Sequence, residues 1–215
     1  MKTLLIHDVT LRDGSHAVGH QLSLEQFCAY ARAADEAGVH VVEVGHGNGL
    51  GASSLQLGES AVADEQLLVA ARESLTRSRL GVHVIPGFAT INQDLRRAIE
   101  IGVDVVRVAS HCTEADITER HISFVREAGK EVYGVLMMSH MASPHTLLDE
   151  ARKMELYGAE GVIIMDSAGA YLPGDVTERI STLVDGLGIP VGFHAHNNLG
   201  LAVGNSLAAV DAGAY

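Results

Sequence analysis

The sequence is poor in several residue types whose presence would define a protein class. Its 215 residues include two cysteines, four prolines and no tryptophan, and only 4% of them are aromatic. Two cysteines, Cys28 and Cys112, are too few for a disulfide framework, so we expect reduced thiols in a cytoplasmic protein. The 23 glycines far outnumber the prolines, which indicates many tight turns and not a proline-rich linker.

Positive charge is also scarce. The chain has 15 Lys and Arg residues against 27 Asp and Glu residues, for a formal net charge of −12. A chain of this sign repels phosphate backbones, and it has no run of basic residues to offset that repulsion. We therefore do not expect nucleic acid as a partner.

Long hydrophobic runs are missing as well. The first apolar run, residues 4–6, gives way at once to polar residues, and no window reaches the length of a signal peptide or a membrane span. Yet 47% of the residues are hydrophobic and 20% are charged, which is enough apolar material for a sizeable core. We expect a soluble, cytoplasmic chain without membrane contact and of a size for one domain.

Short apolar runs alternate with amphipathic segments along the chain. The runs are apolar nearly throughout, as strands buried on both faces are, and the segments carry Leu, Ile and Ala at helical spacing. This alternation predicts a parallel sheet with right-handed crossovers. The expected strands are residues 3–7, 39–44, 80–85, 103–109, 131–138, 161–165 and 190–194. The expected helices are residues 24–37, 64–77, 92–101, 114–128, 144–157, 176–187 and about 199–212.

Glycines mark the junctions between these segments. Gly38, Gly102 and Gly158 each stand between a helix and the next strand, and Gly213 has the same place near the end of the chain. Because glycine tolerates a left-handed backbone, it suits a helix end. Seven strand–helix units without an eighth strand predict a (β/α)8 TIM barrel that is incomplete in this chain. The alternative, a doubly wound open sheet, lacks the Gly-x-Gly-x-x-Gly fingerprint after the first strand.

Polar residues gather where the predicted strands end, which in a parallel barrel is the functional face. His194 and His196 stand two residues apart on the last strand, so their imidazoles point the same way. Two imidazoles and one carboxylate make a mononuclear divalent-metal site, and Asp13, after the first strand, is the natural carboxylate. The pair alone is better explained as surface or hydrogen-bonded histidines; together with Asp13 we favour the metal site.

Three more residues are candidates for the chemistry. Arg12 places a fixed positive charge beside Asp13 and can stabilise an enolate as it forms; an ordinary salt bridge with Glu43 is the alternative, and both can hold at once. His16 can act as a base, although an exposed loop histidine is the simpler interpretation of its position alone. Ser167 can hydrogen-bond a substrate carboxylate, but its sequence context is also that of a turn. Cys112 and Cys28 are interpreted as structural, and so are six other histidines: His7, His20, His40, His83, His121 and His145.

Taken together, these motifs resemble the 4-hydroxy-2-oxovalerate aldolases. That family of class II pyruvate aldolases belongs to the metal-dependent lyase barrels that include hydroxymethylglutaryl-CoA lyase and isopropylmalate synthase. The resemblance covers nearly the whole chain. It rests on residues 8–16 (DVTLRDGSH), 110–116 (SHCTEAD), 137–141 (MMSHM) and 194–197 (HAHN).

The resemblance implies retro-aldol cleavage of 4-hydroxy-2-oxopentanoate to pyruvate and acetaldehyde in aromatic-compound catabolism. It implies Mn2+, with Co2+ or Mg2+ as other possible metals, held by Asp13, His194 and His196. Arg12 would stabilise the pyruvate enolate and His16 would be the base. Arg12, Asp13, Ser167 and His194 would contact the substrate. The family also implies an acylating acetaldehyde dehydrogenase as partner of the full-length protein, and a homo-oligomer is possible.

Other functions remain open on the sequence. We expect residues 1–215 to be a single catalytic domain without the last strand and the carboxyl-terminal helical region of the family. An inactive, truncated remnant is therefore one alternative. A related acyl-CoA lyase or condensing enzyme is the other, although His16 disfavours it, since those relatives commonly have Gln just after the Arg-Asp-Gly. The loop after the second strand has Asn48 where the aldolases usually have Asp, and we expect any difference in aldehyde specificity there.

Overall fold

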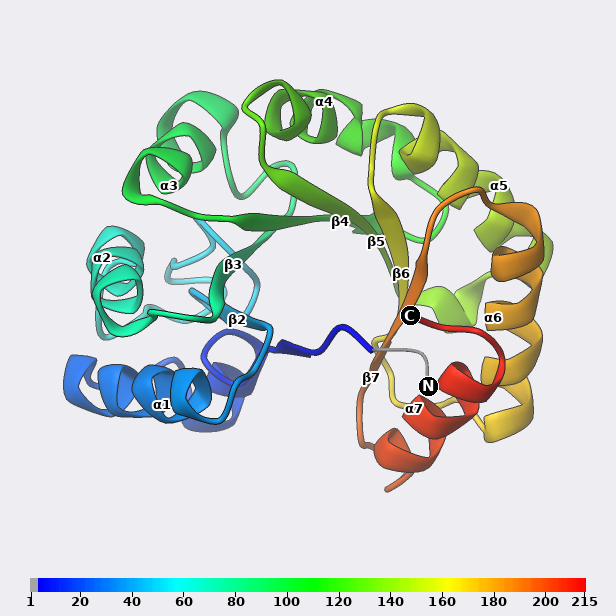
Figure 1. Cartoon of the computed structure of the whole chain (residues 1–215), viewed down its shortest axis with the longest axis horizontal. Coiled ribbons are helices and arrows are strands. Elements are labelled where there is room, and N and C mark those ends of the chain that lie inside the picture. The colour runs from blue at the N-terminus through cyan, green and yellow to red at the C-terminus, as the bar shows by residue number, and fades with distance from the viewer. Residues whose placement is uncertain (1–3) are drawn as a thin grey trace. The chain divides into compact units, whose positions relative to one another are not determined.

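The computed structural model describes residues 4–215 (Figure 1). In these residues seven strands alternate with seven α-helices in the predicted order. The strands are β1 (His7–Asp8), β2 (Val41–Val44), β3 (Arg79–Val84), β4 (Val105–His111), β5 (Glu131–Met137), β6 (Gly161–Asp166) and β7 (Val191–Ala195). The helices are α1 (Leu24–Glu36), α2 (Asp64–Ser74), α3 (Arg96–Ile101), α4 (Glu119–Glu127), α5 (Pro144–Leu156), α6 (Pro173–Gly186) and α7 (Ala202–Asp211).

The strands follow one another in the sheet in chain order, from β1 to β7. Chain order without a reversal is the topology of a (β/α) barrel, whereas a doubly wound sheet reverses its strand order at a switch point. The predicted fold class, a TIM barrel incomplete in the described residues, is therefore confirmed. The doubly wound alternative is wrong.

The chain divides into two compact units. The N-terminal unit is Leu5–Arg107 with Ala128–Glu131, and the C-terminal unit contains Val108–Glu127 and Val132–Tyr215. The boundary between the units runs through β4. That residues 1–215 form one domain stays a prediction, and residues 1–3 lie outside the described part.

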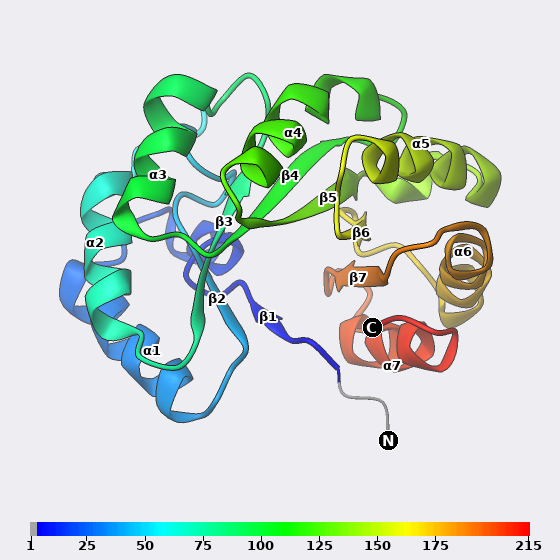
Figure 2. The ribbon, with the colours of Figure 1, turned by 45° about the horizontal axis from the view of Figure 1, so that its top comes forward.

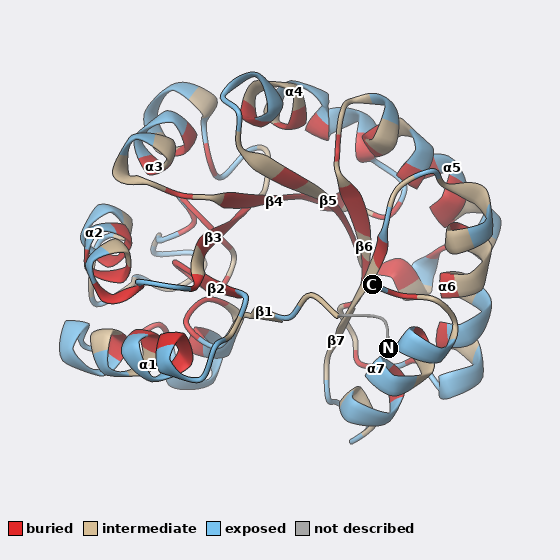
Figure 3. Ribbon diagram, viewed as in Figure 1, coloured by how far each residue is buried: buried red, intermediate tan, exposed pale blue. Residues whose placement is uncertain are grey.

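In the N-terminal unit, β2 lies between β1 and β3. His7 pairs with Val41 in the register of β1 and β2, and Val41 pairs with Arg79 in that of β2 and β3. Every residue of β2 is buried, which fits an apolar strand covered on both faces (Figure 3). Helix α1 is capped by Ser23, whose hydroxyl accepts from the backbone N–H of Gln26 while the Gln26 side chain accepts from the backbone N–H of Ser23.

In the C-terminal unit, β6 lies between β5 and β7. Tyr133 pairs with Gly161, and Met165 pairs with His194. Helices α6 and α7 pack on each other and on β7 (Figure 2). Proline stands at the start of both α5 and α6, where its missing N–H costs no helical hydrogen bond.

Several predicted boundaries are wrong. The first strand, expected at residues 3–7, is β1 (His7–Asp8), and Thr3 lies outside the described residues. The helix expected at residues 92–101 begins as a π-helical turn, Ile91–Leu95, before α3, and that expected at 114–128 begins as a 3-10 turn, Ala115–Thr118, before α4. These ends are set by local hydrogen bonds that the apolar pattern does not report.

Residues 4–215 bear on two expectations, that the cysteines are reduced and that no segment spans a membrane. Cys28 and Cys112 form no disulfide there, and Cys112 is fully buried, in agreement with its structural interpretation. Within the same residues, no helix combines the length and apolarity needed to cross a bilayer.

Candidate active site

The loop after β1 carries three of the candidate residues. It continues into a 3-10 helix, Asp13–Val18, that contains Asp13 and His16 and begins just after Arg12. The carbonyl of Val9 accepts from the backbone N–H groups of Arg12 and Gly14, at 3.1 and 3.2 Å. This turn fixes Arg12 beside the end of β1 and leaves His16 exposed.

The guanidinium of Arg12 is buried and held by three acceptors. Its Nε donates to Oε1 of Glu43 at 2.6 Å, and its Nη1 donates to Oδ2 of Asp13 and to the carbonyl of Gly47, both at 2.9 Å. The predicted salt bridge with Glu43 is thus confirmed. Its Nη2 atom is also buried but has no hydrogen-bond partner among the described residues. Because a buried donor without an acceptor is costly, this atom is suited to an oxygen of a bound anion.

Glu43 is shared between two arginines. Its carboxylate lies on β2 with the side chain about 1% exposed, and Nη1 of Arg107 on β4 reaches its two oxygens at 3.1 and 3.3 Å. Burial alone raises the pKa of Glu43, but the charges of Arg107 and Arg12 outweigh burial and hold that pKa below its ordinary range. Glu43 is therefore ionised and fixes the position of Arg12.

Sequence reasoning missed Arg107. The signal available was a single charged residue inside the run Val105–His111, which is buried along nearly its whole length. A buried charge requires a partner, but the sequence does not identify the partner, since Glu43 lies 64 residues away.

Three histidines meet beside Arg12 in the N-terminal unit. The rings of His20 and His46 are stacked with centroids 3.8 Å apart, and the ring of His16 stands edge-on to His20 at 4.8 Å. Burial lowers the pKa of His20 and of His46, so both rings tend to be neutral. The structural interpretation of His20 did not foresee this contact, and nothing in the spacing of His20 and His46 pointed to it.

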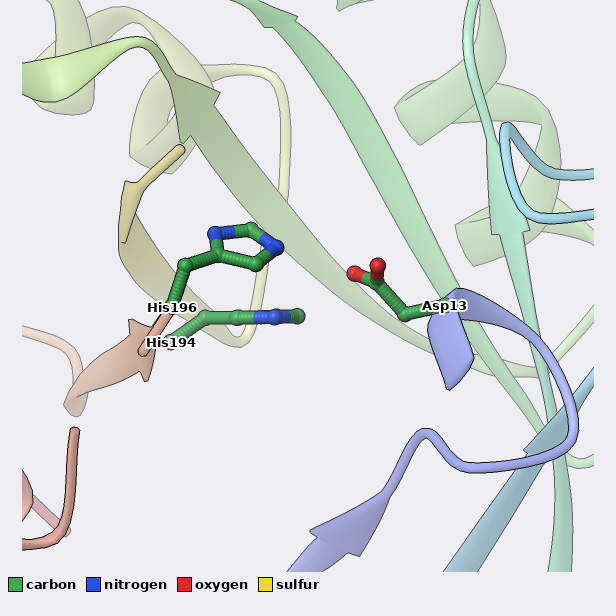
Figure 4. Close-up of side chains that lie close together, drawn as sticks. All are labelled: Asp13, His194 and His196. Carbon is green, nitrogen blue, oxygen red and sulfur yellow. The ribbon is translucent and has the colours of Figure 1, made fainter. Parts of the chain in front are cut away.

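The two histidines of β7 lie side by side, as their spacing predicts. The ring centroids of His194 and His196 are 4.8 Å apart, and both side chains leave the same end of the strand (Figure 4). Nδ1 of His196 donates to the backbone carbonyl of Asp166 at 2.8 Å. This hydrogen bond sets the tautomer in which Nε2 carries the lone pair, the form in which histidine ligates a metal.

Asp166 shapes the loop that provides this carbonyl. Its buried carboxylate accepts from the backbone N–H groups of Ala170 and Tyr171, both at 3.0 Å. The N–H of Gly169 donates to the Asp166 carbonyl and closes the turn that follows Asp166. Asp166 therefore supports His196 through the backbone, a contribution that the sequence analysis did not foresee.

Ser167 follows directly in the same loop. Its Oγ accepts from the backbone N–H of Met138 at 2.9 Å, and Met138 has a left-handed backbone with φ of 54°. A serine hydroxyl that accepts one hydrogen bond still has its own proton to donate. The substrate contact predicted for Ser167 stays a prediction.

The candidate residues thus form two groups. Arg12, Asp13 and His16 belong to the N-terminal unit, and Ser167, His194 and His196 belong to the C-terminal unit. Figure 4 shows Asp13 leaving the turn after β1 and the two histidines leaving β7. Hydrogen bonds hold Arg12 in the first group, and Ser167 and His196 in the second, as expected of a prepared site.

Comparison with known proteins places the chain in a family. The family described as HMGL-like matches residues 3–215. The chain belongs to the HMGL-like family.

Two relatives of the chain have the name of the family that its motifs resemble. The chain is 65% identical to a 4-hydroxy-2-oxovalerate aldolase of Pectobacterium atrosepticum over 99% of its own length, and 63% identical to one of Spirochaeta aurantia over 98%. It spans 62% of the length of each of these relatives.

Solved structures show the same fold. The carboxyl transferase domain of Rhizobium etli pyruvate carboxylase matches with a TM-score of 0.82 at 18% identity, covering 100% of this chain and 39% of that one. A pyruvate carboxylase structure of the same organism with the substitution T882A matches with a TM-score of 0.85 at 20% identity, covering 100% and 23%. At these identities the likeness concerns the HMGL-like fold alone.

Proposed function

We propose that this chain carries the catalytic residues of a divalent-metal-dependent aldolase, which cleaves 4-hydroxy-2-oxopentanoate to pyruvate and acetaldehyde. The observation that carries the proposal is the buried Arg12, which Glu43 holds in place and whose Nη2 has no acceptor in residues 4–215. It stands in a sequence context shared with relatives named 4-hydroxy-2-oxovalerate aldolase.

The donor set fits the metal that such chemistry requires. We propose Asp13, His194 and His196 as ligands, since they offer one carboxylate oxygen and two imidazole nitrogens. The hydrogen bond from His196 to the Asp166 carbonyl and that from Arg12 to Asp13 orient two of the three ligands. When bound, a divalent ion such as Mn2+, or Co2+ or Mg2+ in its place, polarises the carbonyl next to the bond that breaks.

The remaining residues supply the proton transfer and the charge. His16 takes the proton of the 4-hydroxyl group, and the electrons of that O–H bond form the aldehyde carbonyl as the C3–C4 bond breaks. The electron pair of the broken bond passes to the 2-oxo oxygen and leaves the enolate of pyruvate. Arg12 stabilises this enolate, which takes a proton at C3 from water to give pyruvate, while His16 releases its proton to solvent and is again a base.

We also propose which groups hold the substrate. Arg12 and Ser167 offer N–H and O–H donors suited to the oxygens of a 2-oxo acid, and Asp13 and His194 contact it from the metal site. Arg12 is rigid in this arrangement because three acceptors already hold it, so little side-chain entropy is lost when the substrate binds.

We infer the cellular setting from the similarity to the 4-hydroxy-2-oxovalerate aldolases. We place the reaction in the breakdown of aromatic compounds in the cytoplasm, with the acylating acetaldehyde dehydrogenase as partner of the full-length protein. The acetaldehyde formed is reactive and is consumed by oxidation in such a pairing. A homo-oligomer is compatible with this setting.

Substrate comparison tests the proposal. Purified chain is incubated with Mn2+ and either 4-hydroxy-2-oxopentanoate or hydroxymethylglutaryl-CoA, and pyruvate and acetyl-CoA are measured. We expect pyruvate from the hydroxy-oxo acid and no thioester cleavage. Thioester cleavage alone would assign the chain to the lyase relatives, and metal binding without either product would mark it as an inactive remnant.

A further inference from the structure

His16, His20 and His46 form a cluster of three histidines in the N-terminal unit, and the proposed reaction uses only His16. His16 is the proposed base, but it stands edge-on to His20, which is stacked on His46 at a centroid distance of 3.8 Å and an interplanar angle of 28°. His20 and His46 are buried, whereas His16 is exposed. The exposed ring therefore rests against two buried ones.

His46 is fixed at both ring nitrogens. The backbone N–H of Asn48 donates to Nδ1 of His46 at 3.0 Å, so Nδ1 is the acceptor and the ring proton is on Nε2. Nε2 then donates to the carbonyl of Gly58, also at 3.0 Å. Two backbone contacts from one loop thus set the position and tautomer of the ring.

His20 is fixed from the other side. The hydroxyl of Ser15 donates to the carbonyl of Arg12 at 2.6 Å and accepts from Nδ1 of His20 at 3.0 Å. His20 also has a left-handed backbone, with φ of 62°, which a residue other than glycine adopts only where its surroundings enforce it. An ideal Cβ on Gly58 would lie 3.0 Å from Cδ2 of His20, so the loop after β2 packs closely on this ring.

The same loop contacts the base and the arginine directly. A Cβ at position 47 would overlap the His16 imidazole, so Gly47 lies flat against that ring. The carbonyl of Gly47 accepts from Nη1 of Arg12. The loop after β2 therefore contacts both His16 and Arg12, and His46 and Gly58 connect it to His20.

We propose that His46 is a positioning residue for the base: anchored to Asn48 and Gly58 and stacked on His20, it holds the His16 imidazole in the orientation in which that ring takes the substrate proton. This inference rests on the proposed function for the part played by His16. Protonation of Nδ1 in His46 would oppose the N–H of Asn48, so this ring is held in its neutral Nε2–H form.

The first test does not depend on activity. Imidazole NMR of the 15N-labelled chain reports the tautomer of each ring and the chemical shifts of its carbon-bound protons. We expect the Nε2–H form at His46, and we expect His46→Phe, which keeps an aromatic ring but no anchor, to shift the His20 and His16 signals. His145→Phe, at an exposed position in α5, is the control and should leave both signals in place.

The second test measures coupling to the base. In a double-mutant cycle on pyruvate release, His46→Phe should lower kcat roughly 10-fold with KM within about twofold, as a misoriented catalytic group does. In a His16→Ala background the same substitution should change the residual rate less than about twofold, since its effect passes through His16. His46→Gln, which keeps a donor and an acceptor, serves where the Phe variant does not fold and should retain more activity than His46→Ala.

The outcomes separate this inference from the proposed function. Unchanged His16 signals in the His46 variants, or an equal loss of kcat with and without His16, would overturn the positioning role. Wild-type chain without pyruvate release would overturn the proposed function, and the ring signals would still decide whether His46 orients His16.

Discussion

Nε of Arg12 donates to Oε1 of Glu43 over 2.6 Å, and both side chains are almost fully shielded from solvent. Arg107 contacts the same carboxylate from β4. Two arginines share one buried glutamate, so the removal of any one of these three charges should destabilise the protein. The pairing fixes Arg12 and links the stability of the N-terminal unit to its proposed chemistry.

Glu43→Gln should therefore destabilise the protein strongly. The substitution keeps the shape of the side chain but removes the buried carboxylate that Arg12 and Arg107 share, for an expected loss of about 3–5 kcal/mol. Urea denaturation followed by circular dichroism measures this. Glu65→Gln, in the exposed pair with Arg97, is the matched control and should cost less than about 1 kcal/mol; equal losses would show that the buried pair has no special weight.

Arg12→Lys should preserve the charge and lose the activity. Lysine cannot donate at once to Glu43, Asp13, Gly47 and a substrate oxygen in the planar arrangement of a guanidinium. We expect kcat to fall on the order of 100-fold or more, as for the loss of an oxyanion-stabilising donor. Arg97→Lys, on the surface, should be silent. If Arg12→Lys kept the wild-type kcat, Arg12 would have no role in the reaction.

His7 should make the fold sensitive to mild acid. Burial, and then the charge of Arg107, lower the pKa of His7 from 6.5 to about 4. The unfolded chain takes up this proton first as the pH falls, so stability is complete above about pH 6.5 and declines toward pH 4. His7→Gln should reduce this decline in urea titrations at pH 7 and pH 4.5. His145→Gln is the control, and an unchanged pH dependence in His7→Gln would contradict the assignment.

Asp166→Ala should weaken metal binding without removing a ligand. The loop that presents the Asp166 carbonyl to His196 depends on the carboxylate contacts with Ala170 and Tyr171. We expect the Kd for Mn2+ to rise roughly 10- to 100-fold, the usual cost of losing support behind a ligand, and we expect the His196 ring to lose its single tautomer in NMR. Asp149→Ala, on an exposed face of α5, should change neither.

The sequence is informative where the signal is local. Apolar runs locate β2 to β7, and the two-residue spacing of His194 and His196 correctly predicts that their rings lie together. The salt bridge from Arg12 to Glu43 is predictable because a buried charge at one strand end calls for a partner at the next.

Contacts between distant segments are not predictable in this way. His20 and His46 are 26 positions apart in the sequence, and neither the left-handed backbone of His20 nor the stack leaves a periodic trace. Arg107 and Asp166 were missed for the same reason, since their effects depend on cross-strand and backbone contacts. Strand and helix ends also shift, because hydrogen bonds at the ends, and not the apolar pattern, decide them.

Cleavage should depend on a divalent metal at the ligands we propose, Asp13, His194 and His196. The most direct test is pyruvate release from 4-hydroxy-2-oxopentanoate by the purified chain with Mn2+, after chelation, and after Mn2+ is restored, beside the His196→Ala variant. We predict release that is lost with the chelator, returns with Mn2+ and is absent in the variant. Release that persists unchanged in the chelator would contradict the account.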